Sequence, residues 1–140
     1  MNIHLGYVSI SKTIDITCSK TITYTEFNKN KDYNKLNNII IENLTNLEKI
    51  INYNIKNNIH FYRLTSKLIP LATIDEIKFD YINQYKKYYQ RISKKIKKYN
   101  IRIDVHPDQF CVLNSTKKEI VTNSIKILNY HYNILKALNI

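Results

Sequence analysis

Short continuous apolar runs alternate along the chain with longer stretches in which apolar residues recur every three or four positions. The continuous runs predict buried β-strands, and there are three: Ile3–Ser9, Ile59–Leu64 and Ile101–Val105. The periodic stretches predict amphipathic helices: Leu36 to Asn57-Asn58, about Phe79 to Tyr99, and Glu119 to Leu138. The predicted order is therefore strand, helix, strand, helix, strand, helix.

The segments between these elements carry their own signals. The polar stretch 11–34 is long enough to be a loop with local structure. Asn57-Asn58 ends the first helix, because Asn tolerates the left-handed conformation of a helix C-terminus. His106-Pro107 stops the third strand, and Thr116 is a candidate cap for the last helix.

Strands that alternate with helices imply parallel strands joined by right-handed crossovers, hence an α/β fold. Two architectures fit, an open doubly wound sheet and part of a TIM (β/α)8 barrel. The chain has a single glycine, Gly6, so a glycine-rich phosphate loop is absent. A complete barrel takes about 250 residues, and three βα units cannot close one. We expect one domain over residues 1–140, with no second domain.

The formal net charge is +11, from 22 Lys and Arg against 11 Asp and Glu. Such a balance suits a polyanionic partner such as nucleic acid. Lys, Asn and Ile have AT-rich codons, so genome composition accounts for the charge equally well. The second predicted helix carries most of its basic residues on one face. A solvated exterior is the simpler interpretation of that face, and a DNA-contact helix is the alternative.

The cysteines Cys18 and Cys111 lie far apart, which predicts two reduced thiols in a reducing compartment. The N-terminus reads as a strand rather than a signal peptide, and no apolar run approaches the ~18 residues of a membrane span. A cytoplasmic protein with no membrane contact is expected.

In parallel α/β folds, ligands bind at the C-terminal ends of the strands. The candidates at those ends are Tyr7, Ser9, Ser11, Arg63, Ser66, His106, Asp108, Gln109 and Phe110. Pro107 makes the turn after His106 rigid, so that imidazole is either a metal or phosphate ligand or a hydrogen-bonded loop histidine. The other histidines, His4, His60 and His131, are weaker candidates, and a packing role suits His131 best. Tyr7 and Phe110 are placed where an aromatic ring could stack on an unpaired base.

Several short motifs, in order over nearly the whole chain, resemble those of UV-damage endonucleases. They are Leu5-Gly6-Tyr7-Val8-Ser9, Ser19-Lys20-Thr21, Asn43-Leu44 through Asn54, Phe61 to Ser66 with Leu68 to Thr73, His106 to Phe110, and Tyr130-His131 before Leu135. The resemblance implies a TIM barrel that cleaves the DNA backbone on the 5′ side of UV photoproducts, with a cluster of divalent metal ions, often manganese.

The resemblance also implies roles for four residues. His106 matches a metal ligand of the family. Gln109 and Phe110 match the pair that probes the duplex at the lesion, and Tyr7 matches an aromatic that lines the pocket for the displaced nucleotides. These roles agree with general chemistry, because bound metals lower the pKa of an attacking water and an inserted side chain replaces lost base stacking.

Two departures from the family pattern predict that this chain alone is inactive. Ile74 stands where family members commonly have a histidine, and the remaining expected metal ligands fall beyond Ile140. An active enzyme would then need a second chain, or self-association, to complete the barrel. The alternatives are a non-catalytic DNA-binding or half-barrel assembly module, and a degenerate remnant.

Overall fold

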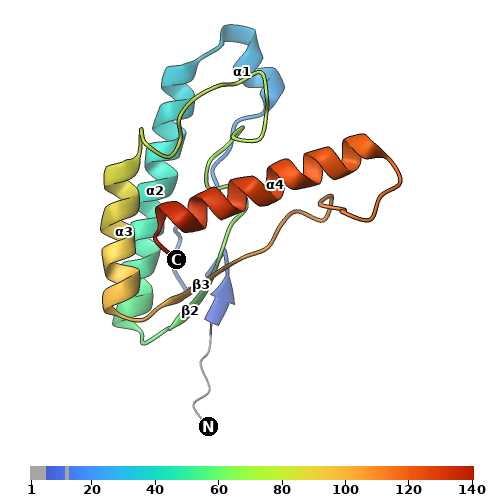
Figure 1. Cartoon of the computed structure of the whole chain (residues 1–140). Coiled ribbons are helices and arrows are strands. Elements are labelled where there is room, and N and C mark those ends of the chain that lie inside the picture. Colours follow the sequence, from blue (N-terminus) through green and yellow to red (C-terminus); the bar gives the residue numbers. More distant parts are fainter. Residues whose placement is uncertain (1–5, 12) are drawn as a thin grey trace.

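The computed structural model describes residues 6–11 and 13–140. Figure 1 shows the three strands beside two long helices, with the last helix crossing them. The described elements follow one another in this order: β1 (Gly6–Val8), α1 (Tyr24–Asn30), α2 (Tyr33–Lys56), β2 (Phe61–Leu64), α3 (Lys86–Lys98), β3 (Arg102–Val105) and α4 (Lys118–Ala137).

The sheet is parallel, with the strand order β1-β2-β3. Tyr7 pairs with Tyr62, which pairs with Ile103, so these three residues share one face of the sheet. The predicted alternation of strands and helices is confirmed. Residues 3–5 of the first predicted strand, and His4 with them, lie outside the described residues.

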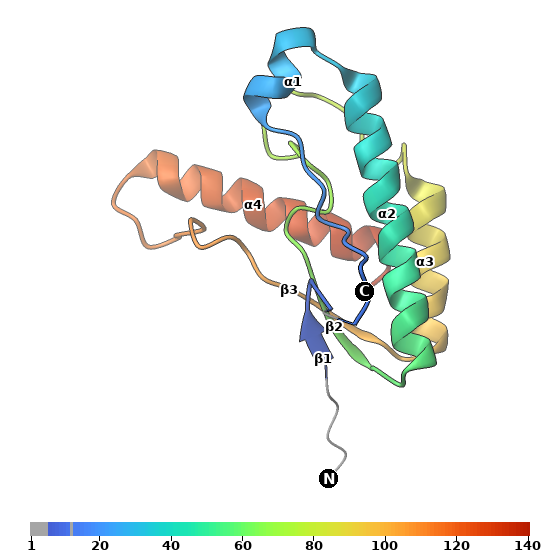
Figure 2. The same cartoon turned by 180° about the vertical axis from the view of Figure 1, so that it is seen from behind.

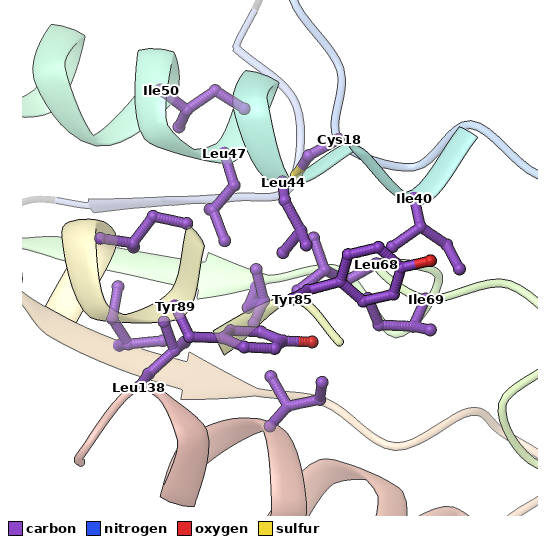
Figure 3. Close-up of a cluster of buried hydrophobic side chains, with 14 of the residues drawn as sticks. Cys18, Ile40, Leu44, Leu47, Ile50, Leu68, Ile69, Tyr85, Tyr89 and Leu138 are labelled. Carbon is purple, nitrogen blue, oxygen red and sulfur yellow. The ribbon is translucent and has the colours of Figure 1, made fainter. Parts of the chain in front are cut away.

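A hydrophobic core fills the space between the sheet and helices α2 and α3. Figure 3 shows side chains from α2, α3, the C-terminal end of α4 and the segment after β2 meeting in one cluster. On α2 the buried apolar residues recur at the predicted helical spacing: Leu36, Ile39, Ile40, Leu44, Leu47, Ile50 and Ile51. This spacing turns one stripe of the helix toward the sheet, and burying the stripe is what stabilises the helix.

The fully buried Asn43 ties the loops to this core. Its side-chain oxygen accepts from the Lys20 amide at 2.9 Å, and its amide group donates to the carbonyls of Lys20 and Leu68 at 2.8 and 3.0 Å. A buried amide satisfied in this way fixes the path of two separate loops at once.

Three predicted details are corrected by the structure. The polar stretch contains a whole helix, α1, which Thr23 caps by accepting from the Glu26 amide. Helix α3 begins at Lys86 rather than near Phe79, because the Asp80 carboxylate accepts from the amides of Ile82 and Asn83 and holds a turn there. Thr116 does not cap α4, whose N-cap is Lys117 with no side-chain cap bond.

The buried face of α4 does not follow the apolar pattern at its N-terminal half. The apolar Ile125 is 48% exposed, whereas the polar Ser124 beside it is fully buried. Figure 2 shows this half of α4, with the loop before it, extending away from α2 and α3. None of the helices in the described part of the chain is long and apolar enough to span a membrane.

Candidate functional site at the C-terminal edge of the sheet

The three strands end at one edge because they are parallel, and the chain leaves that edge in three loops. Past β1, the Ser9 amide donates to the Arg63 carbonyl at 2.9 Å, and the Ser9 carbonyl accepts from the Tyr62 hydroxyl at 3.1 Å. Ser9 has a φ of 53°, so the chain turns sharply away at this point. The edge is thus held by a backbone bond and by the Tyr62 hydroxyl, independently of the candidate functional side chains.

A tight turn follows β3 and carries Gln109 and Phe110 at its tip. The Asp108 carboxylate accepts from the Phe110 amide at 3.1 Å, and the Asp108 carbonyl accepts from the Cys111 amide at 2.8 Å. Gln109 is exposed, and the Phe110 side chain is 72% exposed. A large aromatic ring that an ordered turn leaves mostly exposed to water is typical of a contact surface.

The side chain of Ser124 anchors this turn to α4. Its hydroxyl accepts from the Val112 amide at 2.7 Å and lies 3.1 and 2.8 Å from the carbonyl oxygens of Val112 and Ile120. Sequence reasoning missed both Asp108 as the turn-former and Ser124 as the anchor. An Asp two residues before Phe110 is a sequence signal for such a turn. A serine within an apolar helix pattern gave no comparable signal, because its partners are distant in sequence.

His106 is exposed and lies close enough to His131 for the two to repel electrostatically. Burial, and secondly this repulsion from His106, lower the pKa of the His131 imidazole. The His131 ring packs edge-on against Tyr130 with centroids 5.1 Å apart, which agrees with the predicted packing role. Its Nε2 atom, however, is buried without a hydrogen-bond partner in the part of the chain that the structure describes.

Two hollows flank the turn after β3. One, of about 330 Å³, lies between the segment Ser66 to Thr73 and the side chains of Asp108, Phe110 and His131. The other, of about 380 Å³, is bordered by residues 106–109 together with Cys111, Leu113 and Leu128. Of the predicted site residues, the structure therefore brings His106, Gln109 and Phe110 together around one turn.

Tyr7 lies apart from that turn. Its hydroxyl donates to the Asn54 side-chain oxygen on α2 at 2.7 Å, and its ring meets the Tyr62 ring edge-on at 5.2 Å. Partial burial raises the pKa of Tyr7 to about 12. The described contacts of Tyr7 are thus with the helix-facing side of the sheet, and its role at a nucleotide pocket stays a prediction.

The opposite face of the sheet carries charges. Arg63 and Asp104 are paired in register, with Nη2 and Oδ2 3.6 Å apart, and both side chains are about one-third exposed. The Arg102 guanidinium lies 5.5 Å from the centroid of the Phe61 ring. Together with His60 these residues border a hollow of about 620 Å³ on this face.

The residues present do not by themselves form a metal centre. Within residues 6–11 and 13–140, no three His, Cys, Asp or Glu side chains come together as a metal-ligand group. Ile74, where a histidine is common in the family pattern, packs its half-buried side chain against the core. His106 therefore belongs to no metal-ligand group among the described residues, and one imidazole does not hold a metal ion.

Comparison with known proteins gives a consistent result along the whole chain. A family model described as UV-endonuclease UvdE matches residues 3–140. A UV DNA damage endonuclease of Bacillus mycoides (strain KBAB4) is 40% identical over 144 residues, and one of Bacillus cereus (strain B4264) is 41% identical. Each alignment covers all of this chain and 45% of the relative.

The fold matches a solved structure of the same kind. The crystal structure of SacUVDE superimposes with a TM-score of 0.91 at 31% identity, over 99% of this chain and 47% of that chain. The three parallel βα units are thus the N-terminal half of a TIM barrel, as the sequence predicted. The chain spans just under half the length of the curated relatives that it matches.

Proposed function

This chain belongs to the UV-damage endonuclease family, and we propose that it supplies the lesion-probing half of a barrel that cleaves DNA on the 5′ side of UV photoproducts. The observation that carries the proposal is the turn after β3, which presents Gln109 and the 72% exposed Phe110 at the C-terminal edge of the sheet. Substrates of TIM-barrel enzymes bind at this edge.

In this proposal Phe110 enters the duplex at the lesion. Opening a damaged base step costs a few kcal/mol of stacking, and an inserted aromatic ring replaces part of that stacking. The turn reduces the entropic cost of insertion, because the hydrogen bonds of Asp108 and Ser124 already hold its backbone. Gln109 can then donate to or accept from the exposed base edges, while Tyr7 contributes what remains accessible of its half-buried ring.

His106 is proposed to provide one ligand to a divalent metal ion, with manganese as the expected metal. When bound, such an ion lowers the pKa of the attacking water and offsets charge on the phosphate. Since no metal-ligand group forms within the described residues, the other ligands have to come from the remaining half of a barrel. We therefore propose that this chain alone does not cleave DNA.

The test is a nicking assay on irradiated supercoiled plasmid with manganese, and with unirradiated plasmid as a control. The purified chain is assayed alone and after mixing with the complementary half of the Bacillus cereus relative. Nicking is expected only in the mixture and only on irradiated DNA. His106→Ala in this chain should abolish it, and Phe110→Ala should lower the rate on the order of 10–100-fold, from about 1–3 kcal/mol of lost stacking.

Leu113→Ala is the matched control, because Leu113 is a second exposed apolar side chain, 55% exposed, on the same loop. Its rate should stay within about twofold of the unmodified chain, as expected for an exposed substitution. Damage-dependent nicking by the chain alone would overturn the proposed inactivity. Equal rates for the Phe110→Ala and Leu113→Ala variants would overturn the probing role.

A second candidate function is a non-catalytic DNA-binding or half-barrel assembly module. It is favoured by the face of the sheet that carries Arg63 and Asp104, which helices α2 and α3 do not cover. Such a module would bind irradiated DNA with a steep salt dependence. It would leave the plasmid intact even when the complementary half is present, and this result separates the two candidates.

A further inference from the structure

A hollow of about 700 Å³ lies between helices α3 and α4, away from the edge that carries His106. Four lysines border it: Lys86, Lys94 and Lys97 of α3, and Lys136 of α4. The remaining polar lining consists of neutral amide and hydroxyl groups, from Asn83, Gln90, Ser93, Asn133 and Asn139. No acidic residue borders it, so the lining suits an anion and not a cation.

Five of the seven basic residues of helix α3 lie in two different environments. Arg91 and Lys95 face α2, where the Glu48 carboxylate binds them with N–O distances of 3.0 and 2.9 Å. On the side of the hollow, Lys86, Lys94 and Lys97 are exposed and form no ion pair within the described residues. Helix α3 itself contains no acidic residue. The positive charge is therefore partly compensated by Glu48 on the α2 side, whereas the lysines on the α4 side have no acidic partner within the described residues.

The positions of these lysines form a line along the helix. Lys86 and Lys97 are eleven residues apart in sequence, which is about 16 Å along a helix that rises ~1.5 Å per residue. Each strand of a duplex carries one phosphate for about every 3.4 Å of the duplex axis, so a line of lysines of this length along the axis spans several phosphates. A single small anion would use only one or two of the lysines.

We propose that this lysine groove, formed by Lys86, Lys94, Lys97 and Lys136, binds the phosphodiester backbone of a DNA duplex independently of sequence and of damage. The choice of DNA as the polyanion rests on the proposed function. The one aromatic residue among the described lining, Tyr89, is 1% exposed, so the hollow itself offers no ring on which a base could stack. The exposed Tyr132 ring lies outside the lining, 5.9 Å from the Lys136 ammonium. The contribution of the groove is to hold and orient the duplex.

The groove is complete within this chain. Both of its walls, α3 and α4, are described here, and they contact each other. The hollow shares no lining residue with the two hollows beside the turn after β3. Backbone binding by the groove is therefore measurable without a metal and without the remaining half of a barrel.

The experiment measures the affinity of the purified 140-residue chain for an undamaged duplex of about 20 base pairs, by fluorescence anisotropy at several salt concentrations, with no divalent metal. Replacing Lys86, Lys94 and Lys97 together by Gln should reduce the slope of log K against log salt by about 3 and lower the affinity on the order of 100-fold near 0.1 M salt. Lys136→Gln should reduce the slope by about 1.

Two further variants make the test specific. Replacing the exposed Lys29, Lys49 and Lys56 by Gln removes the same charge from α1 and α2, and should leave the slope nearly unchanged. Replacing the three groove lysines by Arg keeps the charge and should retain binding. Equal losses in the two Gln triples would show that net charge alone drives binding and would overturn the proposal, as would no binding by the unmodified chain.

The result is independent of the nuclease proposal. Nicking of irradiated plasmid by the reconstituted barrel can fail while the groove still binds undamaged duplex in the absence of metal. Conversely, a fully active barrel whose duplex affinity is unaffected by the three Gln substitutions would retain the proposed function and lose the groove.

Discussion

The two faces of the three-stranded sheet use the same strands in opposite ways. On the helix-facing side, Tyr62 and Ile103 are buried and Tyr7 is half-buried with its hydroxyl bonded to Asn54. On the other side, Arg63 and Asp104 are partly exposed, and the Nε atom of Arg63 is buried without a partner in the described chain. Because strand side chains alternate between faces, neighbouring residues such as Tyr62 and Arg63 belong to different environments.

This difference separates the face of the sheet that stabilises the fold from the face that can contribute to a functional site. The helix-facing side is closed, and the hydroxyls of Tyr7 and Tyr62 are bonded within the chain, while the buried Nδ2 atom of Asn54 has no partner among the described residues. On the charged side, the buried Nε atom of Arg63 has no hydrogen-bond partner within the described chain. At the turn after β3, the Phe110 ring is left exposed. A charged face of this kind suits the interior of a barrel that is completed by further strands.

The largest effect is expected from breaking the closed face. Tyr62→Ala should lower the free energy of unfolding by about 3–5 kcal/mol, because removing this fully buried ring leaves a cavity in the core. Its neighbour Phe61, on the other face, is only half-buried, so Phe61→Ala should cost about 1 kcal/mol. Urea unfolding followed by circular dichroism measures both. Losses of similar size would mean that the two faces do not differ as described.

Alkaline pH should lower the free energy of unfolding through the tyrosines of the helix-facing side. In the unfolded chain a tyrosine has its ordinary pKa of 10.0, whereas burial raises the pKa of Tyr7 to about 12 and also raises that of Tyr62. Below pH 10 both states keep the proton and stability is at its full value. As the pH rises from 10 towards 12, the unfolded chain ionises first, so the free energy of unfolding falls.

The measurement is the urea midpoint between pH 9 and pH 12, a window set by the ordinary and the raised Tyr7 pKa values. Tyr7→Phe should make the decline with pH shallower, because one raised group has been removed. Tyr24→Phe removes an exposed phenol, 41% exposed, and serves as the matched control. If both variants declined with the same slope, the Tyr7 hydroxyl would not be held as the structure shows.

The smallest effect is expected on the charged face. The Arg63–Asp104 pair is partly exposed and 3.6 Å apart, so Asp104→Asn should cost about 0.5 kcal/mol or less, and the cost should shrink in ~1 M salt. A double-mutant cycle with Arg63→Gln isolates the interaction between the two side chains. A coupling above about 2 kcal/mol would indicate a buried, structural ion pair and contradict the description of this face.

Most of the fold was predictable because its elements depend on local patterns. The helical spacing on α2 and the short apolar strands specified type and order, and the parallel topology followed from their alternation. The errors arose where one polar side chain overrode the pattern. The turn at Asp80 moves the start of α3 to a later residue than predicted. The Thr23 cap stabilises the short helix α1 within a stretch that was predicted to be a loop with local structure.

The candidate site was predictable only in part. The strand-end rule and the family resemblance identified Gln109 and Phe110, and the structure places both at the tip of one turn. The supports for that turn were not predictable, since Ser124 reaches Val112 across twelve positions in sequence. The sequence also could not predict which basic residues of α3 are paired, because Glu48 lies on another helix and only packing brings it to Arg91 and Lys95.

The sequence by itself determined the α/β class, the order of strands and helices, the family resemblance and the residues at the strand ends, because period, turn chemistry and motif order are local properties. The tertiary structure alone decided which neighbours satisfy each polar group. It brought the Tyr7 hydroxyl to Asn54 and left the Phe110 ring exposed. It also left the Arg63 Nε atom without a hydrogen-bond partner, and Lys86, Lys94 and Lys97 without an ion pair, within the described residues. The physical reason is that burial and pairing depend on groups distant in sequence, which only the packed chain brings together.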